Sequence, residues 1–246
     1  MSWPRIQSKI NILALVLLLS SAAVAQIPAT GLCNTGLTPA SPLPNGCTTS
    51  TLVTPVNPQS GGPNVDGNWG LATPYPSASG NQEAPDPCTL KTFGPAWVDA
   101  PAQGWFNPND GLSQWITPQS DANTAGGWYV YRTTLPIPPN APGAAKYVLT
   151  VTGQLLADDE LPAIFLENPA GDLPNCKLLA LPALSTILGG SGSEYAWNHF
   201  RIVETVVPNT SAYLYFLVYN ISFPAGESGN YTGFRVEFTS AYFTPD

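Results

Sequence analysis

The stretch that decides the fold is SAYLYFLVYNI at residues 211–221. Successive side chains of a β-strand point to opposite faces, and in this stretch both faces are apolar. A strand with two apolar faces is covered on each side, as a central strand of a layered β protein is. Residues 211–221 therefore predict a central strand.

Five further segments have strand patterns, and Pro- and Gly-rich turns separate them. Residues 234–238 alternate Phe, Val and Phe with Arg and Glu, which predicts a strand with one wet face. No helical periodicity alternates with these segments, so the sequence predicts an all-β protein, a two-sheet antiparallel sandwich or a barrel. The other four strand segments are residues 128–134, 146–153, 163–166 and 197–207.

Residues 1–25 have the pattern of a secretory signal peptide. Arg5 and Lys9 form a basic start, residues 12–19 are apolar, and Ala23-Val24-Ala25 is a cleavage site of small residues. The apolar run is shorter than the roughly 20 residues that a membrane-spanning helix needs. We expect a secreted protein, extracellular or periplasmic, with no membrane span.

Residues 26–63 are rich in Pro, Thr, Ser, Gly and Asn and contain no charged residue. Such a segment buries little, so it predicts a linker, or an arm that lies over the domain as a lasso. Within it, residues 51–54 have the composition of one edge strand. Aromatic residues become frequent from Asp66 onward, which places the β-sandwich domain at residues 64–246.

All four cysteines, Cys33, Cys47, Cys88 and Cys176, follow the predicted signal peptide. An even number of cysteines in an oxidising compartment favours two disulfides. Cys33 and Cys47 would close a short local loop and leave Cys88 with Cys176, but the sequence does not choose among the three pairings. No spacing of these cysteines matches a zinc site.

The charge of the exported chain excludes several partners. The chain has eight basic and 16 acidic residues, and the signal peptide removes two of the basic ones. A surface so acidic repels nucleic acid and anionic lipid, because phosphate binding needs Lys and Arg. Neutral glycans and cations remain as possible partners.

Five motifs occur in a characteristic order: Asp66-Gly67-Asn68-Trp69, Ser113-Gln114-Trp115-Ile116, residues 127–134, Gly153-Gln154-Leu155-Leu156-Ala157-Asp158-Asp159 and residues 230–236. Together they resemble the galactose-binding-like jelly-roll modules, similar to carbohydrate-binding modules, of secreted bacterial proteins. The resemblance spans residues 66–242 and implies a two-sheet antiparallel jelly roll with a non-catalytic binding or surface role. Residues 167–176 replace the tight Asn-Gly hairpin of many relatives, so no ligand contacts are carried over from that hairpin.

The densest acidic cluster is Asp158-Asp159-Glu160, between two predicted strands. Its first interpretation is a solvated turn, or an Asp that binds loop amides. Its second is a calcium site, with Asp158, Asp159 and main-chain carbonyls as oxygen ligands. Its third is half of a glycosidase pair, which would need a distant partner such as Glu194 or Glu204.

His199 is the only histidine, so any Ser-His-Asp or Cys-His mechanism would depend on it. It lies in a predicted strand, and the chain has no Gly-x-Ser-x-Gly motif. We therefore expect a hydrogen-bonded histidine on a strand face rather than a catalytic one.

Loop aromatics are the best binding candidates. Sugar rings stack their C–H faces on exposed Trp or Tyr, while Asn, Gln or Asp bind the hydroxyls. Trp97, together with Trp105, Asn107, Asn109 and Asp110, offers both ingredients. Three other tryptophans lie in strand-like positions and are expected in the core: Trp69, Trp115 and Trp128.

The sequence thus predicts a non-catalytic exported module that binds a neutral glycan. The alternative is a structural, self-assembling surface protein, a homo-oligomer in which residues 26–63 add a strand to a neighbour's sheet. An enzyme is the third hypothesis. No cofactor is expected other than a structural calcium.

Overall fold

The computed structural model describes residues 26–42, 48–52, 65–76, 84–99, 111–119, 123–140, 144–169, 173–179, 197–221 and 230–246. These residues form an all-β fold, as predicted. Their only helical element is the single 3₁₀ turn η1 (Pro87–Thr89). Over this part of the chain, no helix has the length and apolar character needed to cross a membrane.

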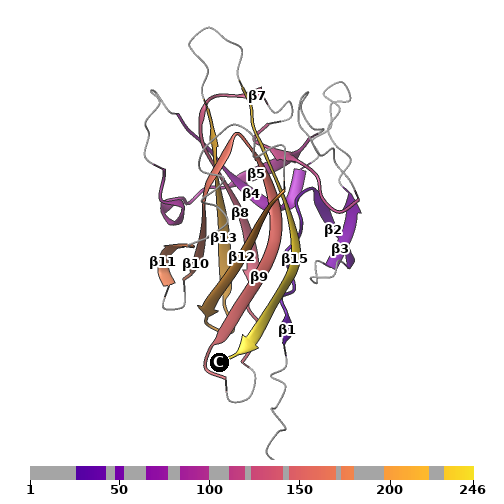
Figure 1. Ribbon diagram of the computed structural model, residues 1–246, viewed down its shortest axis with the longest axis vertical. Helices are drawn as coiled ribbons and strands as arrows, with labels where there is room; N and C mark the ends of the chain where they lie inside the picture. Colours follow the sequence, from indigo (N-terminus) through magenta and orange to yellow (C-terminus); the bar gives the residue numbers. More distant parts are fainter. Residues whose placement is uncertain are drawn as a thin grey trace, which may run out of the picture.

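Most strands belong to one antiparallel sheet of eleven strands (Figure 1). The short strand β1 (Ile27–Pro28) joins it by pairing with β15. In order across the sheet, the other ten are β11 (Leu173–Leu178), β10 (Glu160–Asn168), β13 (Ser211–Asn220), β8 (Gly127–Pro136), β4 (Val65–Pro76), β5 (Gly94–Val98), β6 (Ile116–Thr117), β15 (Gly233–Pro245), β9 (Tyr147–Asp158) and β12 (Asn198–Val206). Two small ladders accompany it, β2 (Leu37–Pro42) with β3 (Thr48–Leu52) and β7 (Asn123–Thr124) with β14 (Asn230–Tyr231).

The main sheet curls around a single large core. Phe216 of β13 lies 4.9 Å from Phe234 of β15 and 6.1 Å from Phe200 of β12, between ring centroids. These strands are far apart in the order of the sheet, so its two halves face each other across the core. The prediction of two separate jelly-roll sheets is not confirmed, because the short strands β5 and β6 join the halves into one curled sheet.

All six predicted strands are present. The predicted central strand is β13, which lies between β10 and β8. Leu214, Phe216 and Val218 point into the main core, as the inner half of the alternation requires. The other face of the sheet carries Tyr215 and Leu217, in a second, smaller cluster.

The first part of the predicted arm is built into the domain. Strand β6 pairs with β15 at Phe234 alone, so most of that edge of β15 needs another partner. Residues 27–37 supply it: the backbone N–H of Ala29 donates to the Ala241 carbonyl, and that of Thr35 donates to the Val236 carbonyl. Residues 27–37 therefore lie along the domain, and the arm or linker at residues 26–63 as a whole stays a prediction. The predicted edge strand is β3, and it pairs with β2 rather than with the main sheet.

The cysteine predictions are tested in part. No described cysteine is free, and Cys33 and Cys88 are disulfide-bonded. The turn η1, which contains Cys88, contacts β11, which contains Cys176. The pairing itself stays a prediction, as Cys47 lies outside the described residues.

A buried carboxylate fastens the arm to β4. Asp66 Oδ2 accepts a 2.6 Å hydrogen bond from the backbone N–H of Gly36, and Oδ1 accepts one of 2.8 Å from Asn68. Gly36 has φ +73°, and a Cβ there would meet the Gln114 side chain at 2.4 Å, so only glycine fits. Burial raises the pKa of Asp66 to about 7, although its backbone hydrogen bonds oppose the rise.

We expect the stability of the fold to decrease as the pH rises, because the folded state holds the Asp66 proton more tightly than the unfolded chain does. This contribution is complete below the ordinary pKa of 3.8 and is lost as the pH passes about 7. The shift corresponds to roughly 4 kcal/mol. Urea unfolding over this pH range should show that the free energy of unfolding depends less on pH in Asp66→Asn than in the wild type. The control Asp246→Asn, at an exposed site, should keep the wild-type dependence on pH. If Asp66→Asn loses as much unfolding free energy with rising pH as the wild type does, Asp66 is not the group responsible.

Gly153 of β9 is needed where β15, β9 and β12 pack most closely. A Cβ at this position would lie 2.5 Å from the Glu237 carbonyl oxygen and 2.6 Å from the Phe200 ring. We expect Gly153→Ala to lower the free energy of unfolding by about 1–3 kcal/mol, measured in urea. Gly67→Ala is the matched control, because a Cβ there meets nothing within 4 Å. Equal stability of the two variants would contradict the close packing.

Candidate functional site

The predicted loop site is described at one residue. Trp97 lies on β5, is half-buried, and pairs in register with Val65 of β4 and Thr117 of β6. The other four members, Trp105, Asn107, Asn109 and Asp110, lie outside the described residues, so the loop site stays a prediction. The prediction for the remaining three tryptophans is confirmed, since Trp69, Trp115 and Trp128 are all buried.

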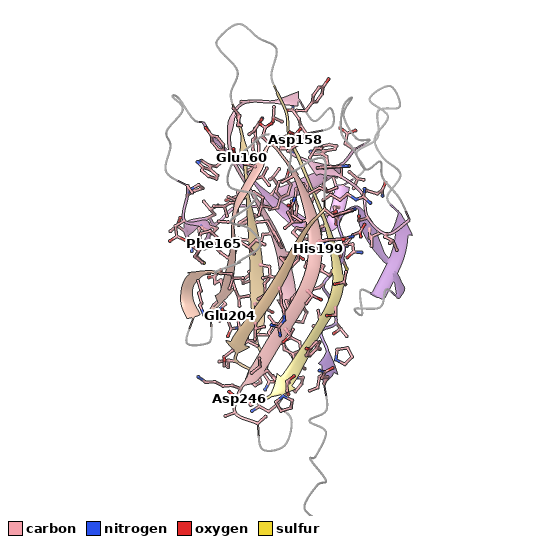
Figure 2. All side chains as sticks on the ribbon, in the orientation of Figure 1. Asp158, Glu160, Phe165, His199, Glu204 and Asp246 are labelled. Atoms are coloured by element: carbon pink, nitrogen blue, oxygen red, sulfur yellow. The ribbon has the colours of Figure 1, made fainter. Side chains whose placement is uncertain are left out.

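The acidic turn is tied into the fold at one end of the sheet, where Figure 2 labels Asp158 and Glu160. The Asp158 carbonyl accepts a hydrogen bond from Thr232 Oγ1, and Asp159 Oδ2 accepts one of 2.7 Å from the backbone N–H of Ile221. These contacts match the interpretation of an Asp that binds loop amides. Among the described residues, no three acidic, His or Cys side chains gather in a group that could hold a metal ion.

Glu204 is wrong as the second carboxylate of a glycosidase pair. It lies opposite Leu149 in β9, nine residues along that strand from Asp158. At about 3.3 Å per residue, this places the two roughly 30 Å apart along the strand, too far to act on one bond. Glu204 instead forms a 2.6 Å ion pair with Lys177 of β11. Glu194 lies outside the described residues.

His199 lies on β12, as predicted, and is exposed (Figure 2). It pairs in register with Gln154 of β9.

A group of partly exposed aromatic side chains lies on the outer face of β8, β10 and β13. The sheet register sets two adjacent rows there. One row aligns Glu167 with Tyr213, and the next aligns Phe165 with Tyr215 and Arg132. Figure 2 labels Phe165 on β10, on the opposite side of the view from β15. Together with Phe93, these five side chains form what we call the aromatic cluster: Phe93, Arg132, Phe165, Glu167, Tyr213 and Tyr215.

Phe93 reaches the cluster from the segment that follows η1. Cys88, Leu90 and Phe93 pack against this outer face and cover its middle. Phe93 also lies over Gly70 of β4, where an added Cβ would be 3.0 Å from the Cβ of Phe93. Tyr215 is buried beneath this cover, whereas Phe165 and Tyr213 stay half-buried at its margin.

Arg132 is held between two rings. Its guanidinium carbon lies 3.8 Å from the Phe93 centroid and 5.1 Å from that of Tyr213. Cation–π contacts of this kind hold the planar guanidinium group in place. Arg132 therefore offers a fixed set of hydrogen-bond donors beside the half-buried Tyr213 ring.

Tyr215 connects the two charged members of the cluster. Its hydroxyl donates a short hydrogen bond to Glu167 Oε2. Burial, and after it the Glu167 carboxylate, raises the pKa of Tyr215 above its ordinary value of 10.0, while Arg132 acts in the opposite direction. The phenol therefore stays protonated and orients the carboxylate. The cluster presents aromatic faces next to a positioned carboxylate and guanidinium group, a combination that suits a hydroxylated ring.

The sequence analysis missed this cluster, although a signal was present. Tyrosines occupy 213, 215 and 219, the positions that alternate with the core residues of β13. The apolar pattern of this stretch predicts a strand that is covered on both sides. The structure shows that the outer cover is incomplete and leaves Tyr213 half-buried.

Comparison with known proteins assigns no family. No family model matches the chain, and no curated protein matches it. Among solved structures, the chain is similar to the enzymatically active domain of bacteriophage CBA120 tailspike protein 4, with 16% identity and a TM-score of 0.31. The match covers 73% of this chain and 20% of that one. A likeness this weak carries no argument about function, and the family resemblance stays a prediction.

We expect Tyr215→Phe to lower the free energy of unfolding by about 1–3 kcal/mol, because it removes a buried hydrogen bond to a charged group. Chemical denaturation measures the loss. Tyr213→Phe is the control: it keeps its ring, and its hydroxyl has no hydrogen bond to a described residue. A loss of similar size in both variants would show that the bond to Glu167 contributes nothing specific.

Proposed function

We propose that this protein is a non-catalytic, exported module that binds a neutral glycan through the aromatic cluster. One observation carries the proposal: the half-buried rings of Tyr213 and Phe165 lie beside a carboxylate and a guanidinium group that are already held in place. A sugar has the matching chemistry, with C–H faces that stack on aromatic rings and hydroxyls that bind planar charged groups.

The charge of the chain supports a neutral ligand rather than an acidic one. Acidic residues outnumber basic ones by 16 to eight over the whole chain. An anionic polysaccharide would meet general repulsion. The predicted signal peptide supports an exported protein, which would meet such polymers outside the cytoplasm.

The alternative of self-assembly through the arm has less support. That hypothesis needs residues 26–63 as a free strand for a neighbouring molecule. Residues 27–29 and Thr35 already bond to β15 of their own domain, and Ala29 and Leu32 lie in its core. Exchange between molecules would have to replace these contacts with identical ones and would gain no new interaction.

Affinity electrophoresis of the exported protein tests the proposal. Gels contain one of several neutral polysaccharides (cellulose ethers, xylan, mannan or β-glucan), each with calcium and with a chelator. We expect one polymer to retard the protein. We also propose calcium at Asp158 and Asp159, and this part is contradicted if the chelator leaves retardation and thermal stability unchanged.

Point variants test whether the aromatic cluster is the site that binds the polysaccharide. Tyr213→Ala should weaken binding about tenfold, the value of one aromatic stack, whereas Tyr213→Phe should keep it. Tyr231→Ala is the matched control, an exposed tyrosine on β14 outside the cluster. The proposal fails if no polymer retards the protein, or if Tyr213→Ala binds as tightly as the wild type. Release of soluble sugars from the polymer would overturn its non-catalytic part.

A further inference from the structure

A second surface of similar chemistry lies on the outer face of β15, β9 and β12. The register aligns Glu237 of β15 with Gln154 of β9, and Gln154 with His199 of β12. Trp197 immediately precedes β12 and is half-buried. These four residues, Gln154, Trp197, His199 and Glu237, are called the Trp197 face.

An ion pair is buried beneath this face. Phe234, Val236 and Phe238 point into the core, so Arg235 and Glu237 point outward. Their side chains are nevertheless only 0% and 8% exposed, and Arg235 Nη2 lies 3.3 Å from Glu237 Oε1. Burying two charges costs several kcal/mol for each unless their hydrogen bonds are satisfied.

The surrounding polar groups satisfy these charges. Ser113 Oγ donates to Glu237 Oε1 at 2.6 Å, and it accepts from Arg235 Nε at 2.6 Å. Gln154 Nε2 donates to Glu237 Oε2 at 2.7 Å. The network therefore fixes the Gln154 amide at one position on the sheet.

The same network positions the tryptophan. The Arg235 guanidinium carbon lies 4.9 Å from the centroid of the Trp197 ring. Arg235 is fully buried, whereas Trp197 is half-buried. Arg235 therefore covers one part of the Trp197 ring, and solvent reaches the rest. An aromatic surface is thus held next to a fixed amide, a carboxylate and the exposed His199.

From this arrangement we infer that the Trp197 face is a second binding site for a neutral saccharide. A sugar ring stacks on Trp197, and its hydroxyls bind Gln154 and His199. The inference rests on the proposed function, because it assigns the same class of ligand.

The two sites cannot share one ligand unit. Both outer faces point away from the core, because the inner faces of β13 and β15 meet at Phe216 and Phe234. One protein therefore binds two saccharide segments on opposite sides and cross-links neighbouring chains. Two linked sites also raise the apparent affinity for a polymer above that for a short oligosaccharide.

Equilibrium dialysis counts the sites. The probes are cellohexaose, xylohexaose and mannohexaose over a range of concentrations, with the full exported chain. We expect two molecules of one probe per wild-type protein. Tyr213→Ala and Trp197→Ala should each leave one site of wild-type affinity and weaken the other about tenfold, and the double variant should keep no site of wild-type affinity. Trp197→Phe should keep two, which separates loss of stacking from loss of fold.

His199→Ala provides a second test that does not touch the buried network. Because His199 is exposed, the variant should keep the wild-type unfolding curve and lose about fivefold in affinity at one of the two sites. Tyr231→Ala again serves as the control.

The outcomes separate the two proposals. One bound molecule per wild-type protein, lost in Tyr213→Ala and kept in Trp197→Ala, overturns the second site and leaves the proposed function intact. One molecule lost only in Trp197→Ala overturns the role of the aromatic cluster and the cross-linking. No binding of any probe, together with no retardation by any polymer, overturns both.

Discussion

The structure depends on the backbone hydrogen bonds of β15. A strand inside a sheet needs partners along both edges, because unpaired backbone groups are costly when buried. Strand β9 pairs along one edge of β15. Strand β6 reaches the other edge at one residue, and residues 27–37 complete it. The first residues after the predicted signal peptide and the last residues of the chain therefore form one part of the core.

The alternation of side chains gives β13 and β15 each an inner face and an outer face with different surroundings. The inner residues of β13 and β15 meet through Phe216 and Phe234 and close the core. Their outer residues carry Tyr213 and Tyr215 on one side and Arg235 and Glu237 on the other. A rigid core thus positions both candidate surfaces, which suits binding because preorganised groups lose little freedom when a ligand arrives.

Buried charge is handled in two different ways. Arg235 and Glu237 form an ion pair and share Ser113 as a common hydrogen-bond partner beneath the Trp197 face. Asp66 relies on backbone N–H groups instead, and burial raises its pKa to about 7. The first arrangement fixes the side chains of the proposed second site, whereas the second links the packing of residues 27–37 against the domain to pH.

Local pattern was enough to predict six of the strands in the main sheet and three buried tryptophans, but it did not predict β4 or β5. The alternation in residues 211–221 and 234–238 reports which side chains share a face, and this is a property of neighbours along the chain. The segment 27–37 has no such period, so its pairing with β15 could not be predicted. Three other features could not be predicted from the sequence either. They are the partial exposure of Tyr213, the distance of Glu204 from Asp158 and the joining of both halves into one sheet. Each depends on register and curvature between segments far apart in sequence, which only the tertiary structure decides.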